Sequence, residues 1–187
     1  MHKTTFALLA LATAGCGPML QYRATPPAPT LYGRVVVEVR DGREPKAGGG
    51  KHEEVGMQTG TFGIPDMITV DGPTTVADTM RQLVSDAARA AGIGVSQDGS
   101  GATARIFVDV QRLWCTGYSP AYKADVTASL SVMDPSGRQI RVPGMPIHAE
   151  DGGMKCKRVF RHALTDFFAA TRAMLQNPNV SGSLVAK

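Results

Sequence analysis

The sequence is poor in several features that other protein classes require. Aromatic residues make up 6% of its 187 residues and charged residues 19%. Only one apolar run stands out, and it is short and lies near the N-terminus. These shortages exclude a disordered acidic chain, a collagen-like repeat and a polytopic membrane protein. The length suits one domain with tails, and a hydrophobic content of 43% is enough for a self-sufficient core.

Motifs that carry catalysis or bind metals are also missing from the sequence. It contains no CxxC, no HExxH and no GxSxG. The run Gly48-Gly49-Gly50-Lys51 resembles a phosphate-binding loop only superficially, because Pro45 replaces the first glycine and His52 replaces the Ser or Thr. We therefore predict a protein that is not an enzyme and binds neither a metal nor a cofactor.

Three histidines lie outside the N-terminal segment. His52 and His148 each stand in a short acidic cluster, and His162 lies in an amphipathic run. Neither acidic cluster has the spacing of metal ligands, so solvated charge in loops is the simpler interpretation. A hydrolase that uses His148 with Glu150 and Asp151 remains a minor alternative.

The N-terminus has the features of an export signal. Lys3 supplies a positive start, Phe6–Ala14 is apolar, and Cys16 follows two small residues. This resembles a bacterial lipobox, with the departure that Thr13 stands where an aliphatic residue is usual. We expect residues 1–15 to be removed and Cys16 to carry the lipid anchor; the alternative is an ordinary signal peptide followed by a chance cysteine.

Processing at this point affects charge and location. After removal of residues 1–15, the chain keeps 19 basic and 16 acidic side chains. The basic residues are scattered without aromatic interleaving, which argues against nucleic-acid binding and favours a mildly positive surface near anionic lipid. Gly17 stands where an Asp would favour the inner membrane. We therefore expect a location on the outer membrane, facing the periplasm.

The remaining chain divides into three parts. Residues 16–30 contain four prolines and form a tether, residues 31–178 form one domain, and residues 179–187 form a flexible tail. Strands are expected at 31–39, 102–114, 122–132 and 138–142, with two further short candidates at 54–62 and 67–70, and the helices are expected at 76–91 and 156–175.

Periodicity supports these elements. Apolar residues alternate with polar ones over 122–132, which is typical of a strand with one wet face. Thr75 and Asp78 suit the start of the first helix, and Gly92 suits its end. We predict an α+β fold with a largely antiparallel sheet of four to five strands and two amphipathic helices on one face.

Two features of the second helix leave alternatives open. Its phenylalanines are assigned to the core, although Phe160–Phe168 could instead form a partner-binding face. Cys115 lies at the end of an expected strand and Cys156 at the start of this helix. In an oxidising compartment the two could form a disulfide; the alternative is that they remain two buried thiols.

The order of these segments resembles the YajG family of bacterial envelope lipoproteins. The resemblance rests on the Val-rich strand ending in Asp41-Gly42-Arg43, the helix TTVADTMRQLVSDAARAAG, and the strands VDVQRLWCTG and YKADVTASLSV before a C-terminal helix. It covers residues 32–178. It implies a lipid-anchored α+β domain with no catalytic residues.

The function expected from these observations is a non-catalytic accessory or scaffold role in a lipid-anchored envelope lipoprotein. Its partners would be the membrane, through the anchor, and an envelope protein. The alternative is an auxiliary lipoprotein of a lipid or lipopolysaccharide transport system, which would need a lipid-sized apolar groove or a docking surface.

Overall fold

The computed structural model describes residues 32–43, 53–59, 65–70, 75–118, 121–141, 145–152 and 156–184. The predicted signal peptide, Cys16 and the tether lie outside these residues. So does His52.

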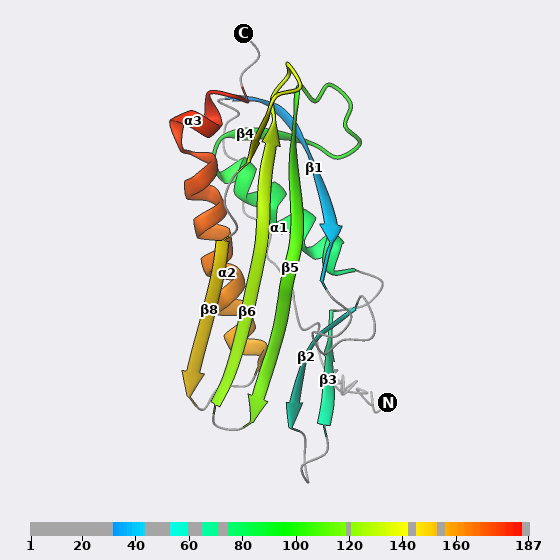
Figure 1. Cartoon of the computed structure of the whole chain (residues 1–187), viewed down its shortest axis with the longest axis vertical. Helices are drawn as coiled ribbons and strands as arrows, with labels where there is room; N and C mark the ends of the chain where they lie inside the picture. The colour runs from blue at the N-terminus through cyan, green and yellow to red at the C-terminus, as the bar shows by residue number, and fades with distance from the viewer. Residues whose placement is uncertain are drawn as a thin grey trace, which may run out of the picture.

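One sheet of eight strands is built around a long central strand, β5 (Figure 1). Along one edge, β5 pairs with β6 over its whole length. Along its other edge it pairs first with β1, up to Val110, and then with β2, at Cys115. The strands are β1 (Tyr32–Asp41), β2 (Glu54–Thr59), β3 (Pro65–Thr69), β4 (Ile93–Ser96), β5 (Ala104–Tyr118), β6 (Ala121–Met133), β7 (Gln139–Arg141) and β8 (Met145–Gly152).

The prediction of a largely antiparallel sheet of four to five strands was wrong. The sheet is mixed: β1 lies parallel to both β4 and β5, and β2 is parallel to β5. Antiparallel pairs join β2 to β3, and β6 to β5, β7 and β8. Alternation of apolar and polar residues indicates that one face of a strand is exposed to solvent. It does not indicate whether the strand runs parallel or antiparallel to its neighbours. Direction depends on the connections, and a helical crossover leads from the first strands into β4.

Two helices, α1 (Val76–Ala90) and α2 (Cys156–Leu175), cover one face of the sheet. Helix α1 packs on β1 and β4, α2 packs on β5, β6 and β8, and the helices contact one another. In Figure 1 both lie behind the strands. The predicted pair of helices on one face is confirmed. No helix within the described segments has the length and apolarity needed to cross a membrane.

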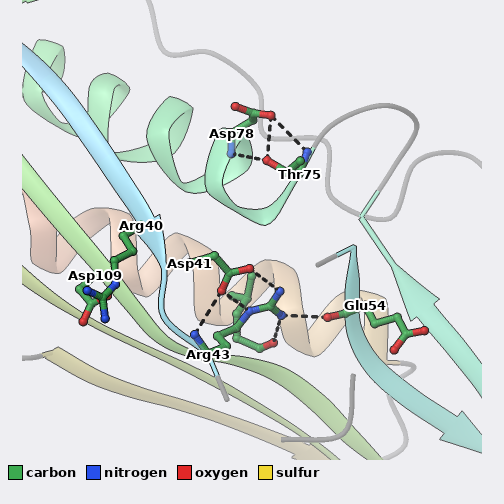
Figure 2. Close-up of polar contacts among 8 residues, drawn as sticks. Arg40, Asp41, Arg43, Glu54, Thr75, Asp78 and Asp109 are labelled. Carbon is green, nitrogen blue, oxygen red and sulfur yellow. Dashed lines mark hydrogen bonds and ion pairs between the residues drawn. The ribbon is translucent and has the colours of Figure 1, made fainter. Parts of the chain in front are cut away.

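The first helix begins and ends at the residues that the sequence indicates. The Thr75 side chain accepts a hydrogen bond from the amide of Asp78, while the Asp78 carboxylate accepts one from the amide of Thr75 (Figure 2). The bonds from Thr75 lower the pKa of Asp78, because they favour its charged form. At the other end, Gly92 has a φ of 85°, which favours glycine.

The core fills the space between sheet and helices. Phe160 and Phe167 are fully buried, as are Met80 and Leu83 of α1. The phenylalanines at 160 and 167 therefore belong to the core, and Phe168 is partly buried against it. Side chains at alternating positions of β6 enter this layer as well.

Two elements at the C-terminal side were not foreseen. Strand β8 occupies residues that the sequence analysis placed in a loop. The chain also continues beyond the predicted end of the domain: Pro178–Ser181 form a short helix, α3, and Leu184 is fully buried. Residues 179–184 are therefore part of the folded domain rather than of a flexible tail.

A disulfide joins Cys115 of β5 to Cys156 at the start of α2, with 5.9 Å between their Cα atoms. Both residues are fully buried. Cys115 points towards the helices because β5 contains a bulge between Val110 and Arg112, which shifts the alternation of faces by one residue. The bond therefore fixes the helix layer to the central strand.

Replacing both cysteines by alanine should lower the free energy of unfolding by about 2–4 kcal/mol, because the bond constrains a loop of about 40 residues in the unfolded chain. Urea denaturation of the oxidised protein and the double variant measures this difference. Reduced wild-type protein is the control and should match the variant. Equal denaturation midpoints for oxidised and variant protein would contradict the expectation.

Candidate functional site

The structure places few of the predicted site residues together. His162 is exposed on α2. His148, Glu150 and Asp151 belong to β8, where they pair with Asp125, Lys123 and Tyr122 respectively. Consecutive strand positions alternate between faces, so positions 150 and 151 belong to opposite faces of the sheet. The register does not bring these three residues to one side.

Metal binding gains no support from the described segments. Within them, no group of three or more His, Cys, Asp or Glu side chains lies close enough to hold an ion.

The face of the sheet opposite the helices carries many polar and charged side chains. We call the side chains of β1, β5 and β6 on this side the open face. Its residues share exposed or half-buried positions that alternate with core positions. They are Arg34, Val36, Glu38, Arg40, Arg105, Phe107, Asp109, Gln111, Arg112, Trp114, Thr116, Lys123, Asp125, Thr127, Ser129 and Ser131.

Ion pairs cross the open face between neighbouring strands. Arg105 of β5 contacts Glu38 of β1 at 2.7 Å, and Arg112 contacts Asp125 of β6 at 3.0 Å. Such pairs are at least partly exposed, so each contributes about 0–1 kcal/mol to stability. Their larger effect is to hold charged groups in fixed positions. Among the residues of this face, five are basic and three acidic, an excess of two positive charges.

A depression of about 490 Å³ on the open face is lined by residues of β1, β5, β6 and β7. Phe107 lies among its lining residues, together with Glu38, Asp109 and Gln139. Arg40 and Asp109 form an ion pair of 3.2 Å there, shown at the left of Figure 2. The depression offers an apolar ring surrounded by hydrogen-bonding groups, a combination suited to contact with a protein surface.

Two exposed methionines extend the open face beyond β5. Met57 of β2 and Met67 of β3 are direct cross-strand partners and are 39% and 41% exposed. Their neighbour Gly56 pairs with the inward-facing Cys115, so both methionines lie on the same side as the half-buried Trp114. Flexible apolar side chains of this kind are common at surfaces that adapt to partners.

Arg43 secures the junction at which β5 changes its partner from β1 to β2. Its Nε and Nη2 atoms donate to the two carboxylate oxygens of Asp41, each at 2.8 Å (Figure 2). Its Nη1 atom donates to the main-chain oxygens of Glu54 at 2.8 Å and Leu113 at 3.3 Å. Only about 10% of either charged side chain is exposed. One guanidinium thus connects β1, β2 and β5.

Gly42 lies at the same junction. Its amide donates to the main-chain oxygen of Val110, and a Cβ atom at this position would lie 2.5 Å from Oδ1 of Asp109. The turn Asp41-Gly42-Arg43, which ended the Val-rich strand in the sequence, is therefore a structural junction.

The sequence analysis predicted neither the junction at Arg43 nor the open face. The alternation in β5 and β6 already marked the polar positions, but not which strand would lie beside which. The two adjacent polar residues Gln111 and Arg112, followed by Leu113, were the signal for the bulge.

Comparisons with known proteins concern the fold alone. No family model matches the chain, and no curated protein matches it. Among solved structures, it is similar to protein XCC0632 from Xanthomonas campestris, described under the family model DUF330, with a TM-score of 0.47 and 15% sequence identity. The alignment covers 89% of this chain and 92% of that chain. A similarity of this size says nothing about function.

Replacing Arg43 by Ala should lower the free energy of unfolding by about 3–5 kcal/mol, because Asp41 loses its buried guanidinium partner. Arg43→Lys should recover only part of this loss, since an ammonium cannot form the planar pair and reach both main-chain oxygens. Chemical denaturation measures both variants. Arg112→Ala, which removes a half-exposed pair, is the control and should cost about 0–1 kcal/mol. A loss no larger than that of the control would refute this account of the junction.

Proposed function

We propose that this chain is a lipid-anchored protein of the bacterial envelope with a non-catalytic accessory or scaffold role. Cys16 would carry the anchor, residues 16–30 would hold the domain away from the bilayer, and the open face would bind a partner protein. The observation that carries the proposal is the open face itself: a sheet surface that none of the described helices covers, with paired charges, a depression and exposed apolar side chains.

The disulfide supports an exported location. Disulfide bonds persist in oxidising compartments such as the periplasm and are rare in the cytosol. The pair Cys115–Cys156 is fully buried and joins two layers of the fold, as a structural bond does. Together with the export signal, this supports a periplasmic domain, and Gly17 favours attachment to the outer membrane.

The composition of the open face favours a protein partner. Its charges of both signs are arranged in cross-strand pairs, and Phe107 and Trp114 lie among them. Interfaces between proteins combine aromatic anchors with a polar rim in this way. The excess of two positive charges favours a partner surface that is mildly acidic.

A role as auxiliary lipoprotein of a lipid or lipopolysaccharide transport system is the second candidate. The space between sheet and helices is occupied by fully buried side chains such as Phe160 and Met80, which disfavours carriage of a lipid in that layer. The version of this role that agrees with the structure is docking to a protein component of such a system.

The relationship to the YajG family is part of the same proposal. It is supported by the order of elements: the Val-rich strand β1 ends at Asp41, α1 comes after β2 and β3, and the two long strands β5 and β6 come before α2, with β7 and β8 between them and that helix.

Photocrosslinking in intact cells tests the docking face. A photoreactive residue at Gln111, exposed on the open face, should give a discrete crosslinked protein, whereas one at His162, exposed on α2, should give none. Mass spectrometry of the product identifies the partner and decides between a scaffold and a transport assembly. Equal crosslinking from the two positions, or none from Gln111, would refute the proposed face.

A Cys16→Ser variant tests the anchor. It should lose the mass of the lipid and move from the membrane fraction to the soluble fraction, because several acyl chains are needed for stable attachment. Intact-mass measurement and fractionation record both changes. Retention of the unprocessed N-terminus by the wild-type protein would contradict the anchor.

A further inference from the structure

Helix α2 carries three exposed arginines on the side away from the core. Its buried residues face the sheet and α1, while Arg158, Arg161 and Arg172 are exposed. At about 100° per residue, these three arginines fall within a sector of about 60°, which we call the arginine stripe. The acidic residue of the helix, Asp166, lies outside this sector, about 110° from its centre. The outer side of α2 is therefore basic.

The arginines of the stripe lack the carboxylate partners that other arginines have. Among arginines with described side chains outside α2, only Arg34 forms no ion pair. Within the described segments, no carboxylate pairs with Arg158, Arg161 or Arg172 either. The arginines that do pair are Arg40, Arg43, Arg81, Arg89, Arg105, Arg112 and Arg138.

The charge of α2 is as large as the net charge of the processed chain. The helix has four basic residues and one acidic residue, an excess of three, and the chain without residues 1–15 has the same excess. Helix α1 has Asp78 in its first turn, as the helix dipole favours, whereas the first turn of α2 has no acidic residue and contains Lys157 and Arg158. Basic residues at the positive end of a helix do not stabilise it, so local stability does not explain their position.

The predicted tether leaves the domain at the end where α2 terminates. A Cβ atom at Gly33 in β1 would lie 2.7 Å from the main-chain oxygen of Leu184, which follows α2 and α3. Figure 1 shows the start of β1 at the same end as α3. Fifteen residues in the polyproline conformation reach roughly 45 Å, whereas α2 is about 30 Å long. An anchor at Cys16 therefore allows the whole of α2 to lie along the bilayer, and any attraction between them decides how near it lies.

We propose that the arginine stripe of α2 binds the anionic phospholipid headgroups of the membrane that holds the anchor, and so orients the domain on the bilayer. This inference rests on the proposed function, since the anchor brings the domain to that surface. Guanidinium groups form paired hydrogen bonds with phosphate oxygens. Each arginine near an anionic surface favours contact about fivefold, so three together favour it roughly a hundredfold.

This orientation agrees with the proposed use of the open face. The helices lie on one side of the sheet and the open face on the other, so the open face then points away from the bilayer towards a partner. His162 lies beside the stripe, about 70° from its centre, and remains exposed to solvent.

Energy transfer on vesicles measures the orientation. The full chain is coupled to a maleimide lipid through the thiol of Cys16, since Cys115 and Cys156 are bonded to each other. A fluorophore is attached through a bioorthogonal amino acid at Ala169, exposed next to the stripe, or at Gln111 on the open face. A headgroup-labelled lipid is the acceptor. Because the coupling supplies the anchor chemically, the result does not depend on whether cells acylate Cys16.

The composition of the vesicles decides the expected result. With phosphatidylcholine containing one third phosphatidylglycerol, transfer from position 169 should be at least about twofold higher than from position 111. With phosphatidylcholine alone the ratio should fall towards one. Salt at 1 M should have the same effect, because it shortens the Debye length to about 3 Å.

Two triple variants locate the contact. Replacing Arg158, Arg161 and Arg172 together by Gln should abolish the difference on anionic vesicles. Thermal unfolding of this variant should stay close to that of the wild type, since no ion pair of the described segments is lost. The matched control removes the same charge from exposed positions elsewhere: Arg81→Gln, Arg105→Gln and Arg138→Gln. It should retain the difference.

The opposite results overturn the proposal. They are equal transfer from positions 169 and 111 on anionic vesicles, a difference that survives the loss of the arginine stripe, or a difference that is lost in the control variant. A discrete protein crosslinked to a photoreactive residue at Ala169 in intact cells would do the same, since the stripe would then face a protein. None of these results affects crosslinking from Gln111 or fractionation of Cys16→Ser, so this proposal and the proposed function can fail independently.

Discussion

The bulge in β5 is the constraint on which the rest of the structure depends. Up to Val110 the inward side chains occupy even positions, and from Leu113 they occupy odd ones. A strand of fifteen residues without this shift would direct Cys115 to the open face, away from Cys156. The shift occurs where β1 ends as a partner of β5 and β2 begins. Nearby, Arg43 bonds the carboxylate of Asp41 in β1 and the main-chain oxygens of Glu54 in β2 and Leu113 in β5. A continuous sheet, a buried disulfide and a polar outer face thus follow from one extra residue.

This arrangement separates the two sides of the sheet by chemistry. The helices and the disulfide make one side a packed layer, and the paired charges of β1, β5 and β6 make the other a polar surface. Between α1 and the ends of β1 and β4 the same layering leaves a hollow of about 510 Å³.

The sequence predicted the local elements better than their arrangement. Strong periodicity and capping residues located both main helices, with α2 at its observed bounds and α1 within one residue of them. Between the predicted strands 122–132 and 138–142 the chain forms a turn at Asp134–Gly137, with the amide of Gly137 bonded to the main-chain oxygen of Asp134. Strand direction could not be obtained from alternation, since parallel and antiparallel strands with one wet face have the same pattern. The short strand β8 was missed because its charged residues resemble a loop, and the junction at Arg43 depends on residues 70 positions apart.

Oxidative footprinting of the open face tests the central claim most directly. Hydroxyl radicals modify exposed Met and Trp side chains, so Met57, Met67 and Trp114 report on this face, and His162 reports on the helix side. If the open face binds a partner, modification of the first three residues should be several-fold lower in intact envelopes than in the purified protein, while that of His162 stays the same. Equal modification of Met57, Met67 and Trp114 in both preparations would show that the face is free in the envelope and would contradict the account.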